Sequence, residues 1–211
     1  MLRSMKQSDT NWKPWLSLST GLALLTAAVS FSVAYAVTGS AFGTVPTPVL
    51  RTYGGVTTDG LARLEVWRLV TAQLVHAKQA HMMLNAITLL LLGNLLERRV
   101  GRTATLLQWV IAGGIATAIS PLSVAWPFNV GTGASQANFA FAGSALVLTL
   151  TGQLRRSLAW PVIVLALLPG LTLDLWHVGY PKLGHVAGLS VGVAGGVLLT
   201  RLEKLRAAQN S

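Results

Sequence analysis

Between Arg102 and Arg155 the chain reads TATLLQWVIAGGIATAISPLSVAWPFNVGTGASQANFAFAGSALVLTLTGQL, without a single Asp, Glu, Lys or Arg. A helix that crosses the hydrocarbon core of a bilayer needs about 20 mostly apolar residues. This stretch is long enough for two such helices joined by a loop. It therefore decides the fold class, and we expect a polytopic, all-α membrane protein.

The composition of the whole chain agrees with this prediction. Of the 211 residues, 52% are hydrophobic and 10% are charged, whereas a soluble domain carries about 25% charged residues. The net charge of +10 does not indicate nucleic-acid binding, because the basic residues lie in short clusters between apolar runs, as membrane topology requires. The chain has no cysteine, which excludes disulfides and cysteine-based metal sites or catalysis.

Six apolar runs are candidates for membrane-spanning helices. We expect a six-helix membrane domain over residues 15–203, between a cytoplasmic N-terminal segment of residues 1–14 and a cytoplasmic tail of residues 204–211. The first run is longer than the apolar core of a signal peptide, so we expect it to be retained. The six runs are Trp15–Val37, Ala80–Leu96, Thr103–Val124, Ala134–Leu154, Leu158–Leu173 and Leu183–Thr200.

The distribution of Lys and Arg predicts the orientation, because basic residues near the ends of spans favour the cytoplasm. With a cytoplasmic N-terminus, eleven basic residues fall inside and five outside, so both termini are expected in the cytoplasm. The lack of eukaryotic targeting signals favours a bacterial inner membrane. The five outside residues are Arg51, Arg63, Arg68, Lys78 and Lys182.

Polar residues inside a membrane are costly and raise a functional hypothesis. His81 and Asn85 lie one helical turn apart, which is also the pattern of residues that join neighbouring helices. Ser135 stands at an expected helix start, where a serine is usually an N-cap. His185 lies beside glycines that recur every fourth residue from Gly184, a pattern that lets two membrane helices touch.

The predicted topology places these polar residues together. His81, Ser135 and His185 fall at the outer ends of the second, fourth and sixth runs, at similar depth on one side of the membrane. Residues that serve only in packing would not be expected to lie at the same depth on the same side of the membrane. Together they supply a nucleophile, a base and side-chain donors for an oxyanion.

At these residues the chain resembles the rhomboid family of intramembrane serine proteases. The resemblance extends from about Glu65 to Gly192 and consists of several motifs in the family's order. The motifs are Trp67-Arg68, His76, His81 to Asn85, Gly93, Glu97 to Gly101, Gly133-Ala134-Ser135, Phe139, Gly143, Gly184 to Gly188, and Gly192.

The resemblance implies a serine endopeptidase that hydrolyses peptide bonds in or near transmembrane segments of membrane proteins, without a cofactor or a metal. Ser135 would be the nucleophile and His185 its base. Asn85, His81 and the backbone N–H of Ser135 would form the oxyanion hole. Asp174, 11 residues before His185, is a poor partner from its position in the sequence, so we expect a Ser–His dyad.

The resemblance also assigns residues around the expected site. Phe139 would pack against the His185 ring, and Trp67 with Arg68 would hold the first loop. Glu97 and Arg99 would form an ion pair at the cytoplasmic end. The residues expected to line the substrate cavity are Gly133, Ala134, Gln136 and Phe139.

Gln136 departs from the family pattern, because most relatives have glycine directly after the nucleophile. A glutamine there would narrow the cavity or add a donor to the oxyanion hole. A non-catalytic relative that binds membrane clients without cutting them is therefore the main alternative. The presence of Ser135, His185, Asn85 and His81 together favours the protease.

Two further function classes fit less well. A transporter often contains internal repeats, and the chain has none. A zinc enzyme needs a ligand pattern such as His-Glu-x-x-His, which is absent, and Asp174 is the only carboxylate near the histidines. The four histidines considered for zinc are His76, His81, His177 and His185.

Overall fold

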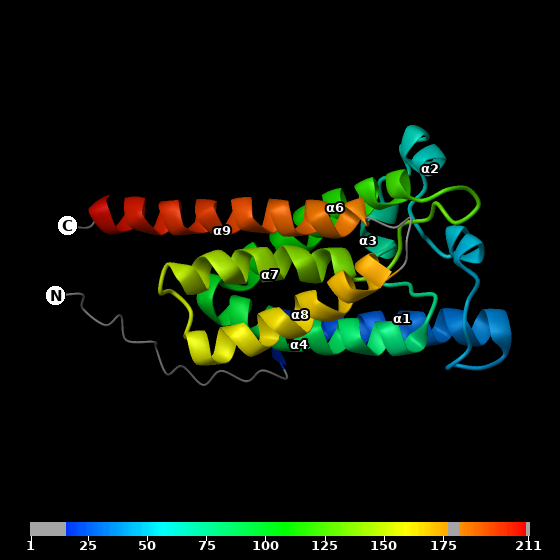
Figure 1. Ribbon diagram of the computed structural model, residues 1–211, viewed down its shortest axis with the longest axis horizontal. Coiled ribbons are helices and arrows are strands. Elements are labelled where there is room, and N and C mark those ends of the chain that lie inside the picture. The colour runs from blue at the N-terminus through cyan, green and yellow to red at the C-terminus, as the bar shows by residue number, and fades with distance from the viewer. Residues whose placement is uncertain (1–15, 177–181, 210–211) are drawn as a thin grey trace.

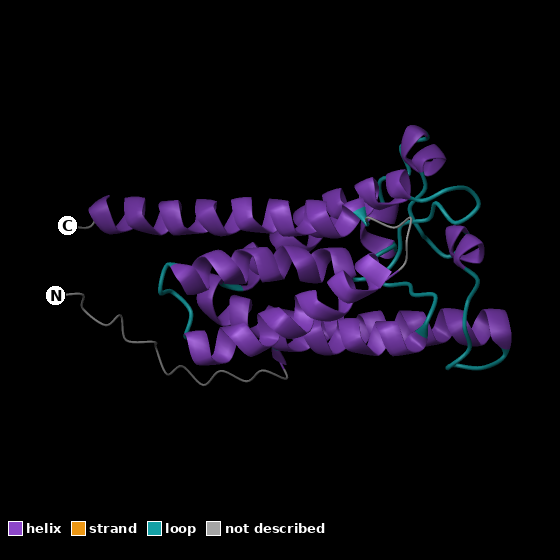
Figure 2. Ribbon diagram, in the orientation of Figure 1, coloured by secondary structure: helices purple, strands orange, loops and turns teal. Residues whose placement is uncertain are grey.

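The computed structural model describes residues 16–176 and 182–209, and their regular structure is helical apart from one antiparallel bridge between Val56 and Gly131 (Figure 2). The predicted segment of residues 1–14 lies outside the described residues. The elements are α1 (Leu18–Thr38), η2 (Thr47–Arg51), α2 (Thr58–Ala62), α3 (Arg68–Thr71), α4 (Gln79–Val100), α5 (Arg102–Leu107), η3 (Gln108–Ala112), α6 (Gly113–Ile119), η4 (Ser120–Ser123), α7 (Ser135–Leu150), α8 (Arg156–Trp176) and α9 (Leu183–Gln209).

Five helical segments in the described part of the chain are long and apolar enough to cross a membrane. This confirms an all-helical protein with several candidate spans, but the count of six stays a prediction. Part of the tail predicted for residues 204–211 is helical, because α9 continues to Gln209. The five segments are Leu18–Thr38, Gln79–Val100, Arg102–Ser123, Arg156–Trp176 and Leu183–Gln209.

The fourth predicted run forms α7, which has 16 residues. At 1.5 Å per residue it is about 24 Å long, shorter than a hydrocarbon core of about 30 Å. Only Leu146, Val147 and Leu150 on this helix are not buried, since α4, α6, α8 and α9 pack around it. A helix covered on all sides by protein need not match the bilayer thickness.

Glycines allow α7 and α9 to touch along their backbones. A Cβ atom at Gly188 would collide with the carbonyl oxygen of Gln136, and one at Gly192 with that of Ala140. On the facing side, a Cβ at Gly143 would collide with a backbone carbonyl of α9. The prediction that this glycine pattern lets two helices touch is thus confirmed, with α7 as the partner of α9. This close approach fixes the position of the start of α9 relative to α7.

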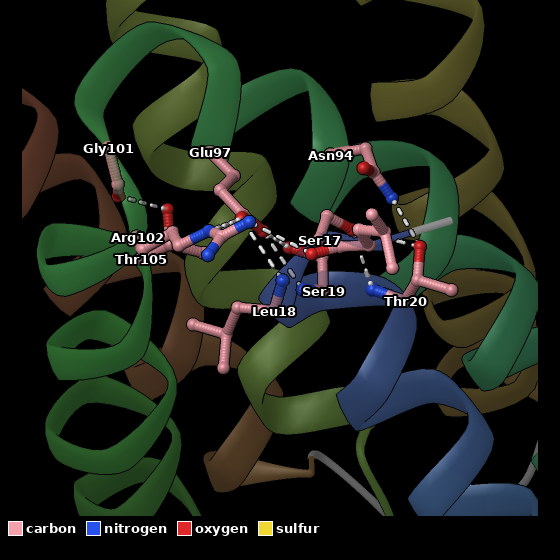
Figure 3. A network of polar contacts seen from close by, with 10 residues as sticks. Ser17, Leu18, Ser19, Thr20, Asn94, Glu97, Gly101, Arg102 and Thr105 are labelled. Atoms are coloured by element: carbon pink, nitrogen blue, oxygen red, sulfur yellow. Dashed lines mark hydrogen bonds and ion pairs between the residues drawn. The ribbon is translucent and has the colours of Figure 1, made fainter. Parts of the chain in front are cut away.

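Glu97, near the end of α4, binds the start of α1 (Figure 3). Its carboxylate accepts hydrogen bonds from the backbone N–H groups of Leu18 at 3.0 Å and Ser19 at 2.9 Å, and from Ser19 Oγ at 2.8 Å. The Nε of Arg102 lies 3.3 Å from the same carboxylate. A buried anion at a helix N-terminus satisfies N–H groups that have no partner within the helix.

The predicted ion pair between Glu97 and Arg99 is wrong. Residues two apart on a helix do not face each other, so the two side chains point to different neighbours. Arg99 forms an ion pair with Glu203 of α9 and donates to Gln153 Oε1 at 2.6 Å. The two residues therefore join α4 to different helices.

The loop between α1 and α4 is held together by Arg68. Its Nη1 donates to the carbonyl oxygens of Arg51 at 2.7 Å and Gly55 at 3.0 Å. Its Nε is ion-paired with Glu65, and its guanidinium lies 4.5 Å from the centre of the Trp67 ring. The adjacent Val56–Gly131 bridge ties this loop to the segment that leads into α7.

Candidate active site

The N-terminal ends of α4, α7 and α9 meet the C-terminal end of α8 at one end of the bundle (Figure 1, right). Ser135 is the first residue of α7, His81 lies in the first turn of α4 and His185 in the first turn of α9. The structure thus brings together the polar residues that the sequence places at similar depth.

His185 lies between a hydroxyl and a carboxylate, and its side chain is 1% exposed. Its Nε2 is 2.9 Å from Ser135 Oγ, and its Nδ1 is 2.7 Å from Asp174 Oδ2. Because a carboxylate only accepts hydrogen bonds, Nδ1 carries the proton and Nε2 presents a lone pair to the serine. This is the tautomer that a general base requires.

The interpretation of Asp174 as a poor partner for His185 is wrong. The two residues are 11 positions apart, but Asp174 lies in the last turn of α8 and His185 in the first turn of α9. The ends of these two helices approach each other in the bundle, which a reading of spacing along the chain does not capture. Lys182 Nζ lies 3.5 Å from the second carboxylate oxygen, Oδ1.

Phe139 fixes the plane of the His185 ring. It lies one turn after Ser135 on α7, and the two rings are stacked with centres 4.2 Å apart and planes 10° apart. This is the packing that the resemblance implies. The imidazole is therefore held on one face by an aromatic ring and at both nitrogens by polar partners.

The turn before α7 aims Ser135 at the site. Gly133 has a φ of 95°, which favours glycine, and its N–H donates to the carbonyl of Ala72 at 2.8 Å. The next N–H, of Ala134, donates to His76 Nε2 at 3.2 Å. Ser135 then begins the helix, where unpaired N–H groups and the helix dipole favour a negative charge.

His76 is the residue whose role the sequence analysis missed. It is 1% exposed and its Nδ1 is 2.9 Å from Ser30 Oγ, which itself donates to Leu74 O at 2.7 Å. The ring therefore donates from Nδ1 and accepts at Nε2, where Asn85 Nδ2 lies at 3.2 Å. Burial, with a smaller contribution from the charge on His81, lowers the pKa of His76 to about 3, so the ring is neutral near pH 7.

The two predicted side chains of the oxyanion hole occupy different positions. His81 lies at the wall of a cavity next to Ser135. Asn85 lies behind it and is 5% exposed; its Oδ1 accepts from Asn138 Nδ2 at 3.2 Å, and its amide nitrogen contacts His76. An amide NH₂ has two hydrogens, and that contact uses one of them.

The cavity beside Ser135 has a volume of about 390 Å³, within the range of small-molecule and peptide pockets. Ser135, His81 and Gln136 are among its lining residues. The turn before α7 does not face the cavity but packs against the first loop, at Ala72 and His76. The Phe139 ring is stacked on His185. Three residues predicted to line the cavity are therefore buried outside its lining: Gly133, Ala134 and Phe139.

A comparison with protein families assigns this arrangement to a known group. The model of the Rhomboid domain matches residues 63–202, which include Ser135, His185 and Asp174. This chain belongs to the rhomboid family.

Two curated proteins are similar to this rhomboid at low sequence identity. Rhomboid-like protease 3 of Toxoplasma gondii is 28% identical over 152 residues, which cover 67% of this chain and 54% of that protein. RHOMBOID-like protein 4 of Arabidopsis thaliana is 28% identical over 156 residues, which cover 72% of this chain and 39% of that protein. The rhomboid thus spans about half or less of the length of these two relatives.

Gln136 contacts the serine of this rhomboid. Ser135 Oγ donates to Gln136 Oε1 at 3.2 Å, so the glutamine competes with His185 Nε2 for the single hydroxyl proton. The Gln136 amide nitrogen lies 3.4 Å from Ser120 Oγ and 3.5 Å from the carbonyl of Thr132. These long contacts hold the amide only weakly.

The described residues of the rhomboid contain no group of three His, Cys, Asp or Glu side chains that would hold a metal ion. His76 and His81 are near each other, with ring centres 5.9 Å apart. His177, the fourth histidine considered for zinc, lies outside the described residues.

Proposed function

We propose that this rhomboid is an intramembrane serine protease that hydrolyses peptide bonds in or near transmembrane segments of membrane proteins. The observation that carries the proposal is the 2.9 Å contact between Ser135 Oγ and His185 Nε2 beside a cavity. A nucleophile within hydrogen-bond reach of an oriented base is the signature of covalent acyl transfer.

The first half-reaction follows from this geometry. As Ser135 Oγ attacks the peptide carbonyl carbon, its proton passes to His185 Nε2. The carbonyl oxygen becomes an oxyanion, and the donors for it are the Ser135 backbone N–H, His81 and Asn85. The C–N bond then breaks, the amine leaves with the proton from Nε2, and an acyl-serine remains.

The second half-reaction uses water. His185 Nε2 takes a proton from a water molecule that attacks the acyl carbon, and returns it to Ser135 Oγ when the ester bond breaks. Both half-reactions proceed without a cofactor.

The substrate must present an extended backbone. A peptide bond in a membrane helix is hydrogen-bonded and shielded, so the segment has to unwind before its carbonyl reaches Ser135. We therefore expect substrates with helix-weakening residues such as Gly or Pro below the cut, and a small residue before it, to fit beside His81 and Gln136 in the cavity.

A non-catalytic rhomboid that binds membrane clients is the second candidate, and one contact favours it. If the Ser135 hydroxyl donates to Gln136 Oε1, its proton is turned away from the base. In that case Gln136→Gly, which removes the competing acceptor, should create or strongly increase the reactivity of Ser135.

Labelling with a fluorophosphonate probe tests the proposal. Purified wild-type protein in detergent should form a covalent adduct, which mass spectrometry of the tryptic peptides locates at Ser135. Ser135→Ala should not be labelled. Equal labelling of both proteins would refute the assignment of the nucleophile, whereas labelling of Gln136→Gly alone would favour the non-catalytic protein.

A further inference from the structure

Asp174 is a mostly buried carboxylate that the mechanism above does not use. Its side chain is 13% exposed and lies in the last turn of α8. Among the described residues its polar side-chain partners are His185, at 2.7 Å from Oδ2, and Lys182, at 3.5 Å from Oδ1. A buried charge is retained at low cost only where it is paired.

The position of this carboxylate is unfavourable without those partners. The C-terminal end of a helix carries a partial negative charge, which disfavours an anion in the last turn. Nothing in the packing of α8 requires an acid there, since its other buried residues are Ala159, Ile163, Ala166 and Gly170. The contacts of Asp174 are instead directed to the start of α9, where the base of the proposed protease lies.

We propose that Asp174 is a positioning residue for His185, so that this rhomboid works with a Ser–His–Asp arrangement rather than a dyad. The proposal rests on the proposed function and adds a role that acts through the base. Asp174 does not touch the reacting atoms. It holds the Nδ1–H of His185, while Lys182 on the opposite carboxylate oxygen keeps Oδ2 turned toward the ring.

The chemistry of the step gives Asp174 two effects. Before the reaction, the carboxylate selects the tautomer with Nδ1 protonated, which leaves the Nε2 lone pair on Ser135. When Nε2 takes the serine proton, the ring becomes a cation that donates from both nitrogens, and the adjacent anion compensates its charge. The proton on Nδ1 stays on the ring throughout the step. The other charged or titratable groups near the ring are Lys182 and His81.

Asp174→Asn tests the proposal because it preserves size and removes charge. An asparagine amide can donate to Nδ1, which favours the tautomer that cannot accept the serine proton. We expect the rate constant of fluorophosphonate labelling, and kcat for a model transmembrane substrate, to fall by about 10²- to 10⁴-fold. KM should stay nearly constant, and the acid limb of the pH–rate profile should move to lower pH.

Matched variants separate positioning from folding. Asp59→Asn, which changes an exposed carboxylate on α2, should label at the wild-type rate. Asp174→Glu should recover part of the lost rate, because it restores an acceptor at a slightly different distance. A thermal unfolding midpoint of Asp174→Asn close to wild type would show that the loss of rate is not a loss of fold.

A spectroscopic measurement decides the proposal independently of activity. In protein labelled with ¹⁵N-histidine, the His185 signals, assigned by their absence in His185→Gln, should report a protonated Nδ1 in wild type and a protonated Nε2 in Asp174→Asn. Wild-type protein that is never labelled and cleaves nothing would refute the proposed protease, and the NMR result would still decide the role of Asp174. An unchanged tautomer, or labelling of Asp174→Asn at the wild-type rate at every pH, would overturn the positioning role.

Discussion

We propose that Asn85 has a structural role and a chemical role, and the two can be tested separately. His76 and Asn138 hold its amide in place, and in the proposed protease its second amide hydrogen donates to the oxyanion. Removal of one preorganised donor typically costs about 10²- to 10³-fold in turnover. We expect Asn85→Ala to slow cleavage of a transmembrane substrate by this factor while Ser135 still reacts with a small probe.

Asn94→Ala is the matched control for that experiment. Asn94 lies on the same helix, farther from the site, where its amide contacts Thr20 Oγ1 and Leu90 O. The Asn94→Ala variant should cleave the substrate at the wild-type rate. Full activity in Asn85→Ala, measured by product formation over time, would remove Asn85 from the oxyanion hole.

His76 makes the stability of the protein depend on pH. Its pKa is about 3 in the folded protein and 6.5 in a free side chain, so the unfolded chain binds a proton that the folded protein rejects. The contribution to stability is therefore complete above pH 6.5 and is lost as the pH falls toward 3. By this linkage, the free energy of unfolding should fall by about 2 kcal/mol between pH 7.5 and pH 5.

The measurement is the unfolding free energy in detergent for wild type and His76→Gln across that range. The variant should be less stable at pH 7.5 because its amide cannot reproduce both imidazole contacts, but its stability should depend less on pH. Parallel pH curves for the two proteins would contradict a buried neutral His76.

Among the elements, α9 sets the distance between the serine and the histidine. Gly188→Ala places a Cβ against the carbonyl of Gln136, whereas a Cβ at Gly195 on the same helix makes ordinary contacts with the side chains of Ser144, at 3.5 Å, and Gln108, at 3.9 Å. Overpacking of a close contact costs about 1–3 kcal/mol. We expect Gly188→Ala to lower both the unfolding midpoint and the rate of Ser135 labelling, and Gly195→Ala to change neither by much.

If Gly188→Ala and Gly195→Ala had the same unfolding midpoint and the same labelling rate, the close contact at Gly188 would not position His185. A loss of stability in Gly188→Ala without a loss of labelling rate would separate helix packing from the geometry of the site.

The elements also explain what the sequence could and could not predict. Long apolar runs predict where helices lie, and the spacing of Gly184, Gly188 and Gly192 predicts a touching face. Contacts between side chains on different helices cannot be predicted in this way, because they depend on how the helix ends are placed in space. The resemblance therefore gave the wrong partner for Glu97, and spacing along the chain gave no role for Asp174, which meets His185 because the end of α8 lies beside the start of α9.

At the scale of the whole molecule, the site lies at one end of the bundle, and α1 begins and α9 ends at the opposite end (Figure 1). The bias of basic residues predicts that the opposite end faces the cytoplasm. A reporter fused after Ser211 should therefore behave as cytoplasmic, and one inserted in the loop of residues 53–60 as external. The reverse pattern in intact cells would place the site on the cytoplasmic side.

The family could be predicted because rhomboid motifs recur in a fixed order over most of the chain, and the same motifs indicate the polar residues that the structure brings together at one end of the bundle. The environment of those residues could not. His76 is an example: its partners Ser30, Asn85 and Ala134 come from α1, α4 and the turn before α7, and no local pattern joins them. Packing across the bundle also decides which residues line the cavity. Gly133 packs against the first loop at His76 and Ala72, and Phe139 stacks on His185, so neither is among the lining residues.

We propose that Ser135 and His185 together cleave membrane proteins, and mass spectrometry of the products would reveal whether they do. Wild type, Ser135→Ala, His185→Ala and the double variant would be reconstituted in liposomes with a model substrate whose transmembrane helix contains Gly or Pro. We predict one cut near the outer end of that helix by wild type and none by either single variant, with no further loss in the double variant, because the pair acts as a unit. The same cut made by Ser135→Ala would show that Ser135 is not the nucleophile.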